Sequence, residues 1–445
     1  MAEKTVDDAA GKQAQENDSY LSDHTIAMRK VVVEYCQQFQ RSKERQCDHL
    51  LNQLNARQHG MASNLAQIRK EAYQEFWNQN PPVVETIDCT AITPQEFRIQ
   101  FHHRNIPCIL RGLDQTSFRS VMDQWLHPDG TIHREWFRQE LGAETVVPLR
   151  QSAKGDLDED GRAMECRTKH VPLQEWIEYL IHVKDQEELW YLKDWHLLQE
   201  LLGHAVASKR SKQNLYHCPE YFQYDLLNNM LVKCTKGDYR FCYWGPSNSN
   251  TTRHSDVLHS FSWSFTISGT KQWTFYGPNK TLTCLQGEGE TMFVPSTWQH
   301  DVINLQETLS INHNWITTAI IDETWNCLQV EITAIKKELG AWGIGESSWS
   351  SQENMLRGCV GLDVTAFFLM NLMRLVELLS TTCHSDHQDE WSFDTYRLVA
   401  MLEVMIKDHD LHLQDRLSSV LESEDYAKIA YNTATEALDL VRTFQ

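Results

Sequence analysis

The stretch 253-RHSDVLHSFSWSF-265 is the part of this sequence that decides the fold. His254 and Asp256 are two residues apart, and on a β-strand that spacing places both side chains on one face. Bulky apolar and aromatic residues then recur through residues 257–265. An imidazole and a carboxylate on one face can bind a metal ion, or they can form a hydrogen-bonded pair at a strand end. The motif by itself leaves both interpretations open.

The same His-x-Asp spacing occurs elsewhere in the chain, in contexts that do not suggest a site. The further pairs are His127/Asp129, His384/Asp386 and His387/Asp389. The first encloses a Pro and precedes a Gly, which predicts a turn. The other two lie in a polar link between helical segments. We interpret these two as solvated pairs.

The surroundings of His254 are different. Short strands follow it, and Lys271 comes directly after the turn formed by residues 268–270. A second histidine, His300, lies in 293-FVPSTWQHDVINL-305, which predicts a strand, a Pro turn and another strand. Asn312 and Asn314 alternate along the strand 310-SINHNW-315. Polar side chains therefore recur at matching places in several strands of one region.

Composition limits the classes of function. Of the 445 residues, 41% are hydrophobic and 23% charged, so the chain can form a large core in one to three domains. The formal net charge of −20 would repel phosphate backbones. We therefore expect no nucleic-acid partner and favour a basic protein segment instead.

Cysteine usage and hydropathy indicate an intracellular protein. The 12 cysteines include no CxxC pair, which suits a reducing compartment. The N-terminal residues contain no apolar run of a secretory signal. No window has the ~18 apolar residues that a membrane span requires. We expect the protein in the cytoplasm, with the nucleus as a further location, and no membrane partner.

Periodicity divides the chain into four parts. Residues 1–19 are polar and predict a disordered tail. Residues 20–80 show apolar residues at helical spacing. This pattern predicts either a helical hairpin or a coiled-coil partner site. Residues 81–318 form a unit in which short strands dominate from residue 188 onward, typical of a sandwich or barrel. Residues 319–445 are helical, and could pair two chains or cover the β-rich part. We favour the covering role and a monomer.

Taken together, three motifs are similar to those of a known family. They are His254-x-Asp256, Gly269-x-Lys271, and F-V-P-x-x-W-x-H-x-V-x-N-L at residues 293–305. The sequence resembles the JmjC family of iron(II)- and 2-oxoglutarate-dependent oxygenases from about Val83 into the C-terminal helices. This resemblance implies an α+β fold, with a double-stranded β-helix (a cupin-like jelly roll) at 81–318 and helical regions on either side.

The resemblance also implies roles for individual residues. His254, Asp256 and His300 would hold iron(II), leaving three coordination positions for cosubstrate and O2. Lys271 would bind the far carboxylate of 2-oxoglutarate, although a lysine on a strand is more often solvated. Further cosubstrate contacts are expected from Tyr191, Ser264, Thr251, Asn312 and Asn314. Tyr191 could equally be a buried core residue, Thr251 a turn residue, and Ser264 stands where a relative has Asn.

The implied activity is that of a 2-oxoglutarate-dependent dioxygenase. His-x-Asp rather than His-x-Glu favours protein hydroxylases over histone demethylases. The resemblance further implies lysyl C-hydroxylation of a eukaryotic peptide-chain release factor, a role in translation termination. The alternatives are a JmjC lysine demethylase and, in another class, a non-catalytic scaffold on a cupin fold. The short connection between residues 277 and 290 predicts that a substrate-binding insertion found in some relatives is missing.

Overall fold

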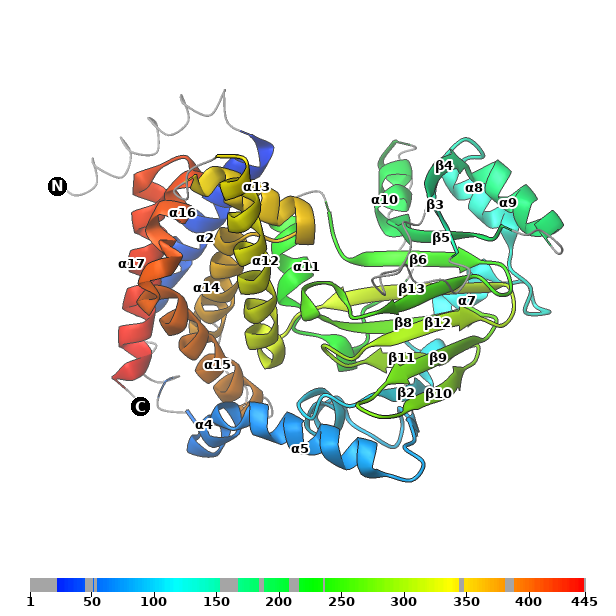
Figure 1. The fold of residues 1–445 in the computed structure, drawn as a ribbon, viewed down its shortest axis with the longest axis horizontal. Coiled ribbons are helices and arrows are strands. Elements are labelled where there is room, and N and C mark those ends of the chain that lie inside the picture. Colours follow the sequence, from blue (N-terminus) through cyan, green and yellow to red (C-terminus); the bar gives the residue numbers. More distant parts are fainter. Residues whose placement is uncertain are drawn as a thin grey trace. The chain divides into compact units, whose positions relative to one another are not determined.

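The computed structural model forms two compact units (Figure 1). It describes residues 22–44, 51, 54–152, 167–183, 188–207, 216–234, 237–343, 348–380 and 388–443. The β unit comprises the described residues of 65–225 and 239–316, and the helical unit those of 1–64, 226–238 and 317–445. The predicted tail, the pair His384/Asp386 and His387 lie outside the described residues, whereas Asp389 lies in α15 (Gln388–Lys407) and accepts a hydrogen bond from the Asn55 side chain.

The two units do not coincide with the four segments predicted from the sequence. The segment 20–80 contributes α2 (Asp23–Glu44) to the helical unit and α5 (Leu65–Asn78) to the β unit. The segment 226–238, inside the predicted β-rich part, belongs to the helical unit. An apolar stripe shows that a helix is buried on one face but does not show which core that face contacts. Periodicity therefore did not reveal that α2 and α5 belong to different units.

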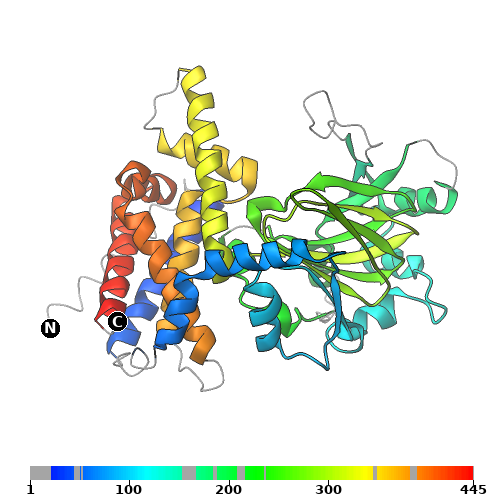
Figure 2. The same cartoon turned by 60° about the horizontal axis from the view of Figure 1, so that its bottom comes forward.

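The β unit contains a nine-stranded and a four-stranded sheet (Figures 1 and 2). In spatial order the large sheet consists of β1 (Glu85–Asp88), β2 (Cys108–Arg111), β11 (Thr291–Val294), β8 (Phe261–Ser268), β13 (Thr308–Trp315), β6 (Arg240–Gly245), β5 (Trp190–Trp195), β3 (Val146–Gln151) and β4 (Thr168–Pro172). The small sheet consists of β10 (Thr281–Gln286), β9 (Lys271–Tyr276), β12 (His300–Asn304) and β7 (Asn250–His254). Except for the β1–β2 pair, the ladders are antiparallel.

The two sheets share a hydrophobic core. Trp273 and Phe275 of β9 and Met292 and Val294 of β11 belong to one buried cluster, although they come from different sheets. Burial alternates along β9, so that one face is buried and the other partly exposed. This arrangement confirms the predicted α+β class with a jelly-roll core.

Helix α5 closes one side of this core. Its Phe76 and Trp77 join the same cluster, and the Trp77 ring stacks on Trp298 with centroids 5.6 Å apart. A Cβ atom at Gly277 would lie 2.5 Å from the Trp77 ring. Glycine at this position is therefore required for the helix to approach the small sheet so closely.

The remaining helices of the β unit are α6 (Pro94–Phe97), α7 (Arg119–Trp125), α8 (Arg134–Leu141), α9 (Leu173–His182) and α10 (Leu197–Ala207). A capping box starts α6: Thr93 Oγ1 accepts a hydrogen bond from the Glu96 amide, and Glu96 Oε2 accepts one from the Thr93 amide.

One local expectation was wrong. His254 ends β7, and Asp256 lies beyond that strand and begins the 3₁₀ turn Val257–His259. The two side chains therefore do not share a strand face. The connection between β9 and β11 contains a further strand, β10, which forms an edge of the small sheet and packs Leu282 and Cys284 against the core.

The helical unit has α14 at its centre. Its helices are α2, α4 (Ala56–Ser63), α11 (Leu226–Cys234), α12 (Ile321–Ala341), α13 (Trp349–Val360), α14 (Val364–Ser380), α15 (Gln388–Lys407), α16 (Leu413–Leu421) and α17 (Glu424–Arg442). The helical character predicted for residues 319–445 is confirmed by α12 to α17. Within the described part of the chain no single helix could cross a bilayer by length and hydropathy; α13 and α14, bent by 76° at their break, meet that test only as a pair. The residues of α14 are mostly buried.

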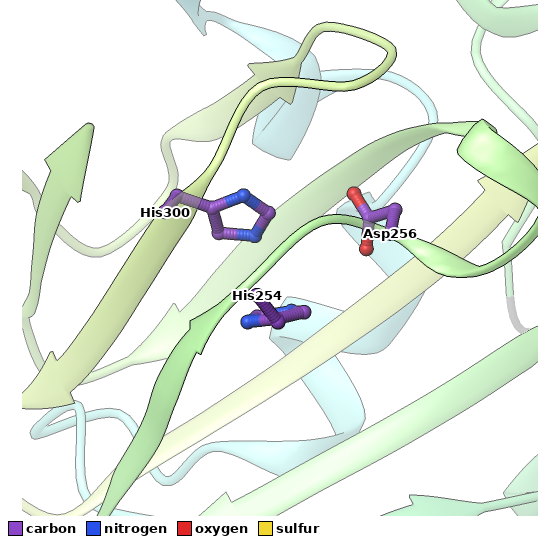
Figure 3. Close-up of side chains that lie close together, drawn as sticks. All are labelled: His254, Asp256 and His300. Atoms are coloured by element: carbon purple, nitrogen blue, oxygen red, sulfur yellow. The ribbon is translucent and has the colours of Figure 1, made fainter. Parts of the chain in front are cut away.

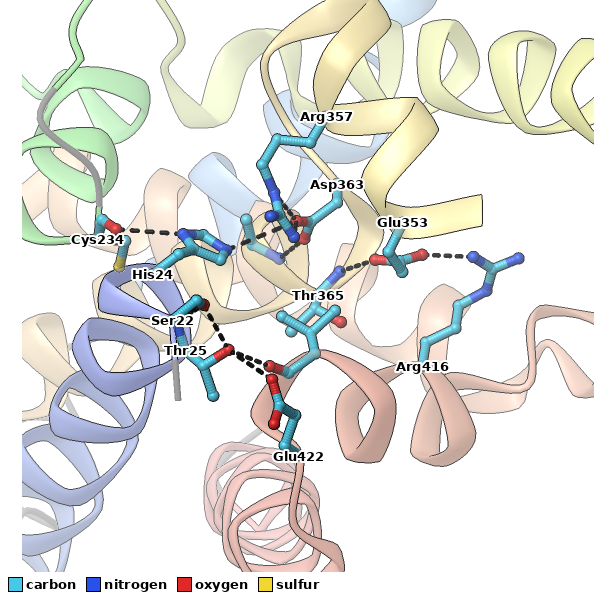
Figure 4. A network of polar contacts seen from close by, with 12 residues as sticks. Ser22, His24, Thr25, Cys234, Glu353, Arg357, Asp363, Thr365, Arg416 and Glu422 are labelled. Atoms are coloured by element: carbon cyan, nitrogen blue, oxygen red, sulfur yellow. Dashed lines mark hydrogen bonds and ion pairs between the residues drawn. The ribbon is translucent and has the colours of Figure 1, made fainter. Parts of the chain in front are cut away.

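A buried polar network joins helices of this unit (Figure 4). The Arg357 guanidinium pairs with the fully buried Asp363 at 2.7 Å, and Asp363 also accepts the Ala366 amide at the start of α14. Arg416 of α16 pairs with the buried Glu353 of α13. Burial raises the pKa of Glu353 to about 7, and the neighbouring Asp363 adds to the rise. These pairs fix α13, α14 and α16 to one another.

Candidate metal and cosubstrate site

Three side chains meet between the two sheets of the β unit (Figure 3). His300 of β12 lies directly opposite His254 of β7 in the ladder, and their ring centroids are 4.4 Å apart. One ligand atom from each of His254, Asp256 and His300 lies within 4.8 Å of the other two. No other group of three His, Cys, Asp or Glu ligands with this proximity occurs among the described residues.

Backbone hydrogen bonds orient both imidazoles for metal binding. His254 Nδ1 lies 2.7 Å from the Thr252 carbonyl oxygen, and His300 Nδ1 lies 3.0 Å from that of Trp298. A carbonyl oxygen only accepts, so Nδ1 carries the proton and Nε2 keeps its lone pair. Burial lowers the pKa of His254 to about 4, and His300 adds to this effect. At neutral pH His254 is therefore in the uncharged form that coordinates metals.

The Asp256 carboxylate has its own support from β8. Ser262 donates its hydroxyl to Asp256 Oδ2 over 2.7 Å. The bond holds one carboxylate oxygen, and Figure 3 shows the carboxyl group turned toward the two imidazoles. Two imidazoles and one carboxylate form the donor set that iron(II) takes in oxygenases, so the residues present fit this metal.

Lys271 bridges the interior from the small sheet to the large one. Its side chain is 1% exposed, and Nζ donates to Ser310 Oγ at 2.7 Å and to Ser264 Oγ at 3.1 Å. No carboxylate among the described residues forms an ion pair with it. Burial lowers the pKa of Lys271 to about 7, and the nearby Lys193 adds to this effect. A buried ammonium between neutral hydroxyls fits the carboxylate of an incoming ligand.

All the residues proposed from the sequence line one cavity. They are Tyr191, Thr251, His254, Asp256, Ser264, Lys271, His300, Asn312 and Asn314. The two asparagine amides also make internal bonds, from Asn312 Nδ2 to Ser310 Oγ at 2.9 Å and from Asn314 Nδ2 to Ser260 Oγ at 3.1 Å. Tyr191 is buried, and its hydroxyl bonds to the Asn304 side chain.

Sequence reasoning missed three polar residues of this cavity, Lys193, Tyr243 and Ser262. Ser262 is two residues from Ser264 on β8, so the period-two alternation of a strand was the signal that could have found it. Lys193 lies at the register shift in β5, where this alternation is interrupted, and Tyr243 has no predicted site residue two positions away.

Comparison with known proteins agrees with this geometry. A family model described as "JmjC domain, hydroxylase" matches residues 276–315, which include His300, Asn312 and Asn314. The "2-oxoglutarate and iron-dependent oxygenase JMJD4" of Danio rerio is 26% identical over 420 residues, covering 82% of this chain and 95% of that protein.

The chain contains a JmjC domain and is similar over most of its length to 2-oxoglutarate- and iron-dependent oxygenases.

Of two further relatives, one has the same activity in its name and the other a different one. The "2-oxoglutarate and iron-dependent oxygenase JMJD4 homolog" of Drosophila melanogaster is 34% identical over 203 residues, 40% of this chain and 46% of that protein. The "Arginine-specific demethylase JMJ20" of Arabidopsis thaliana is 28% identical over 298 residues, 55% of this chain and 60% of that protein.

In this JmjC oxygenase the protein supplies ligands, orientation and exclusion of water. His254, Asp256 and His300 would hold iron(II), and Lys271 would hold the distal carboxylate of 2-oxoglutarate. When bound, the metal and cosubstrate supply oxidation of a substrate C–H bond by O2. The rings of Trp273 and Phe275 lie 5.6 and 6.0 Å from that of His300, so one side of this ligand is shielded by apolar surface.

We expect Ser262→Ala to weaken metal binding by roughly tenfold, because loss of a hydrogen bond to a metal ligand typically costs 10- to 100-fold in affinity. The measurement is the Kd of Mn(II) by calorimetry. Ser264→Ala is the matched control: it lies two residues along the same strand but donates no bond to Asp256 and contacts Lys271 instead. Equal Mn(II) affinity in the Ser262 and Ser264 variants would contradict the role of Ser262.

The affinity for 2-oxoglutarate should fall as the pH rises above 7. The pKa of Lys271 is about 7 in the empty cavity, and a bound carboxylate raises it, so binding takes up a proton. Below pH 7 the ammonium is already charged and the affinity levels off. Above pH 7 the Kd should increase by up to about tenfold per pH unit.

Calorimetry of the Mn(II)-loaded protein in buffers of different ionisation enthalpy measures this uptake directly. About one proton should be taken up at pH 8.5 and close to none at pH 6. In Lys271→Met the Kd of the remaining 2-oxoglutarate binding should not depend on pH in this way. Proton uptake that persists in this variant would assign the effect to another group.

Proposed function

We propose that this JmjC oxygenase hydroxylates a carbon of a lysyl side chain in a protein substrate. The observation that carries the proposal is the pairing of an Asp-containing triad with a buried lysine in one cavity, in a chain related to named oxygenases. The "Bifunctional arginine demethylase and lysyl-hydroxylase psr-1" of Caenorhabditis briggsae, 25% identical over 299 residues, supports lysyl hydroxylation as one reaction of this family.

For the substrate, we propose a eukaryotic peptide-chain release factor. The support is the similarity over most of the chain to proteins named JMJD4, together with a net charge of −20 that favours a basic segment around a target lysine. We further propose that the protein acts as a monomer, in the cytoplasm or the nucleus.

A second candidate activity is demethylation of an N-methylated side chain. The names of the Arabidopsis and Caenorhabditis relatives both include arginine demethylation. Both reactions use the same site and differ in product: loss of a methyl group releases formaldehyde, whereas C-hydroxylation leaves a stable added oxygen.

Product analysis tests the proposal. The protein is incubated with iron(II), 2-oxoglutarate and matched lysyl, methyl-lysyl and methyl-arginyl peptides of the release factor. One added oxygen on an unmodified lysine, absent with the Asp256→Ala variant, is the expected result. Formaldehyde from a methylated peptide without added oxygen would favour demethylation. Cosubstrate turnover without modification of any of these peptides would exclude the proposed substrate.

A further inference from the structure

A bulge in β5 lies at the edge of the site. Leu192 pairs with Trp244 and Trp195 with Cys242, so β5 contains one residue more than β6 between these pairs. Asp194, within the bulge, has φ = 56°, a left-handed conformation that is uncommon for a residue other than glycine. Bulges of this kind occur next to active sites, where they redirect a side chain.

Two partners hold the bulge in place. Tyr243 donates its hydroxyl to Asp194 Oδ1 over 3.1 Å, and the Arg150 guanidinium pairs with Asp194 Oδ2 at 2.7 Å. The Tyr243 side chain itself lines the cavity. The unusual backbone of Asp194 is therefore maintained by contacts from β6 and β3, and this fixes the preceding residue, Lys193.

Lys193 points its charge into the site. Its Nζ lies 5.5 Å from the ring centre of Tyr243 and 5.9 Å from that of Tyr191. Lys193 lines the same cavity as Lys271, at the expected carboxylate end, and His254, at the metal end. The charge of Lys193 is therefore present in the cavity in which a dicarboxylate would lie.

A second cavity, of about 210 Å³, adjoins the first beside His254. The two cavities share Tyr191, Lys193, Thr251 and His254. Arg150 is the other charged residue that lines the second cavity, and no carboxylate side chain lines it among the described residues. The lining suits an anion, and it would repel the ammonium group of a target lysine.

We propose that Lys193 is a second cation for the cosubstrate, placed where the outer cavity meets the site, and that it draws the 2-oxoglutarate dianion inward toward Lys271. The inference rests on the family activity and is independent of which protein side chain is oxidised. 2-Oxoglutarate carries a carboxylate at each end. Lys193 would attract the dianion as it enters, and Lys271 would bind its distal carboxylate.

Lys193→Met tests the proposal, since it removes the charge and keeps most of the side-chain length. Binding of 2-oxoglutarate to the Mn(II)-loaded protein is measured by calorimetry and by stopped-flow fluorescence at several salt concentrations. The Kd should rise roughly tenfold, and the association rate should become slower and less dependent on salt. Lys193→Arg, which keeps the charge, should stay within about threefold of the wild type.

Lys169→Met is the matched control. Lys169 lies on the edge strand β4, which β3 separates from β5; its Nζ lies over the ring of Trp190, and it lines neither cavity. Its variant should bind 2-oxoglutarate as the wild type does. An unchanged Kd and salt dependence in a folded Lys193→Met protein would overturn the proposal. So would a change confined to the KM of a peptide substrate, which would assign Lys193 to that substrate. Because the binding assay contains no peptide, its result does not depend on the proposed lysyl hydroxylation.

Discussion

His300→Ala should lower the conversion of 2-oxoglutarate to succinate by roughly three orders of magnitude, a loss of ~4 kcal/mol of transition-state stabilisation. His300 is 2% exposed and is one of three ligands that meet at a single point. Removing it leaves one imidazole and one carboxylate. Within the described part of the chain no further ligand of this cluster can replace it. The same loss is expected for His254→Ala.

Metal content and turnover are measured together. His300→Ala should retain less than stoichiometric iron(II), and added iron should not restore its rate. His170→Ala serves as control, because His170 is an exposed histidine of β4 in the same unit and should leave both quantities unchanged. A His300→Ala protein with stoichiometric iron and wild-type turnover would exclude the assigned metal site.

Arg416→Met should destabilise the helical unit by about 3–5 kcal/mol, the usual cost of removing one member of a buried ion pair. Arg416 and Glu353 are both fully buried. Arg416 also donates to the Gln352 side chain at 2.6 Å and to the Leu411 carbonyl at 2.8 Å. The substitution therefore leaves a buried carboxylate and two acceptors without their donor.

The loss of stability caused by Arg416→Met should depend on pH. The pKa of Glu353 is raised by folding to about 7 from an ordinary value of 4.5, so the folded state holds a proton that the unfolded state releases. The contribution of this group to stability is therefore largest below pH 4.5 and decreases as the pH rises through 7. The Arg416 charge lowers the pKa of Glu353, so its removal makes ionisation of this carboxyl less favourable in the folded state. Arg416→Met should therefore cost more stability at pH 8, where the carboxyl would ionise, than at pH 5.

Urea denaturation followed by circular dichroism measures the free energy of unfolding, with allowance for separate transitions of the two units. Arg442→Met is the matched control: Arg442 pairs with Glu403 on the surface of the same unit, where such a pair contributes at most about 1 kcal/mol. The double variant Arg416→Met/Glu353→Met should recover most of the lost stability. Equal effects of the Arg416 and Arg442 substitutions would contradict a structural role for the buried network.

Local sequence was sufficient to predict much of the β unit. Strands such as β9 and β13 follow from apolar and aromatic runs between turn residues, and the start of α6 follows from the Thr93–Glu96 capping box. His254, Asp256, Lys271 and His300 were proposed as a group because their motifs resemble those of the JmjC family. The strands and the helix start depend on residues close in sequence, whereas this grouping depended on the resemblance.

What the sequence by itself determined was the class of fold, the residues proposed for the site and the chemistry that they suit. Only the tertiary structure decided that α2 and α5 belong to different units, that Asp256 lies beyond its strand, and that a bulge turns Lys193 into the cavity. It also decided that Ser262 supports Asp256 and that Arg416 meets Glu353. The physical reason is that alternation and periodicity report which face of an element is buried, whereas the partner that each buried side chain meets depends on packing between segments distant in sequence.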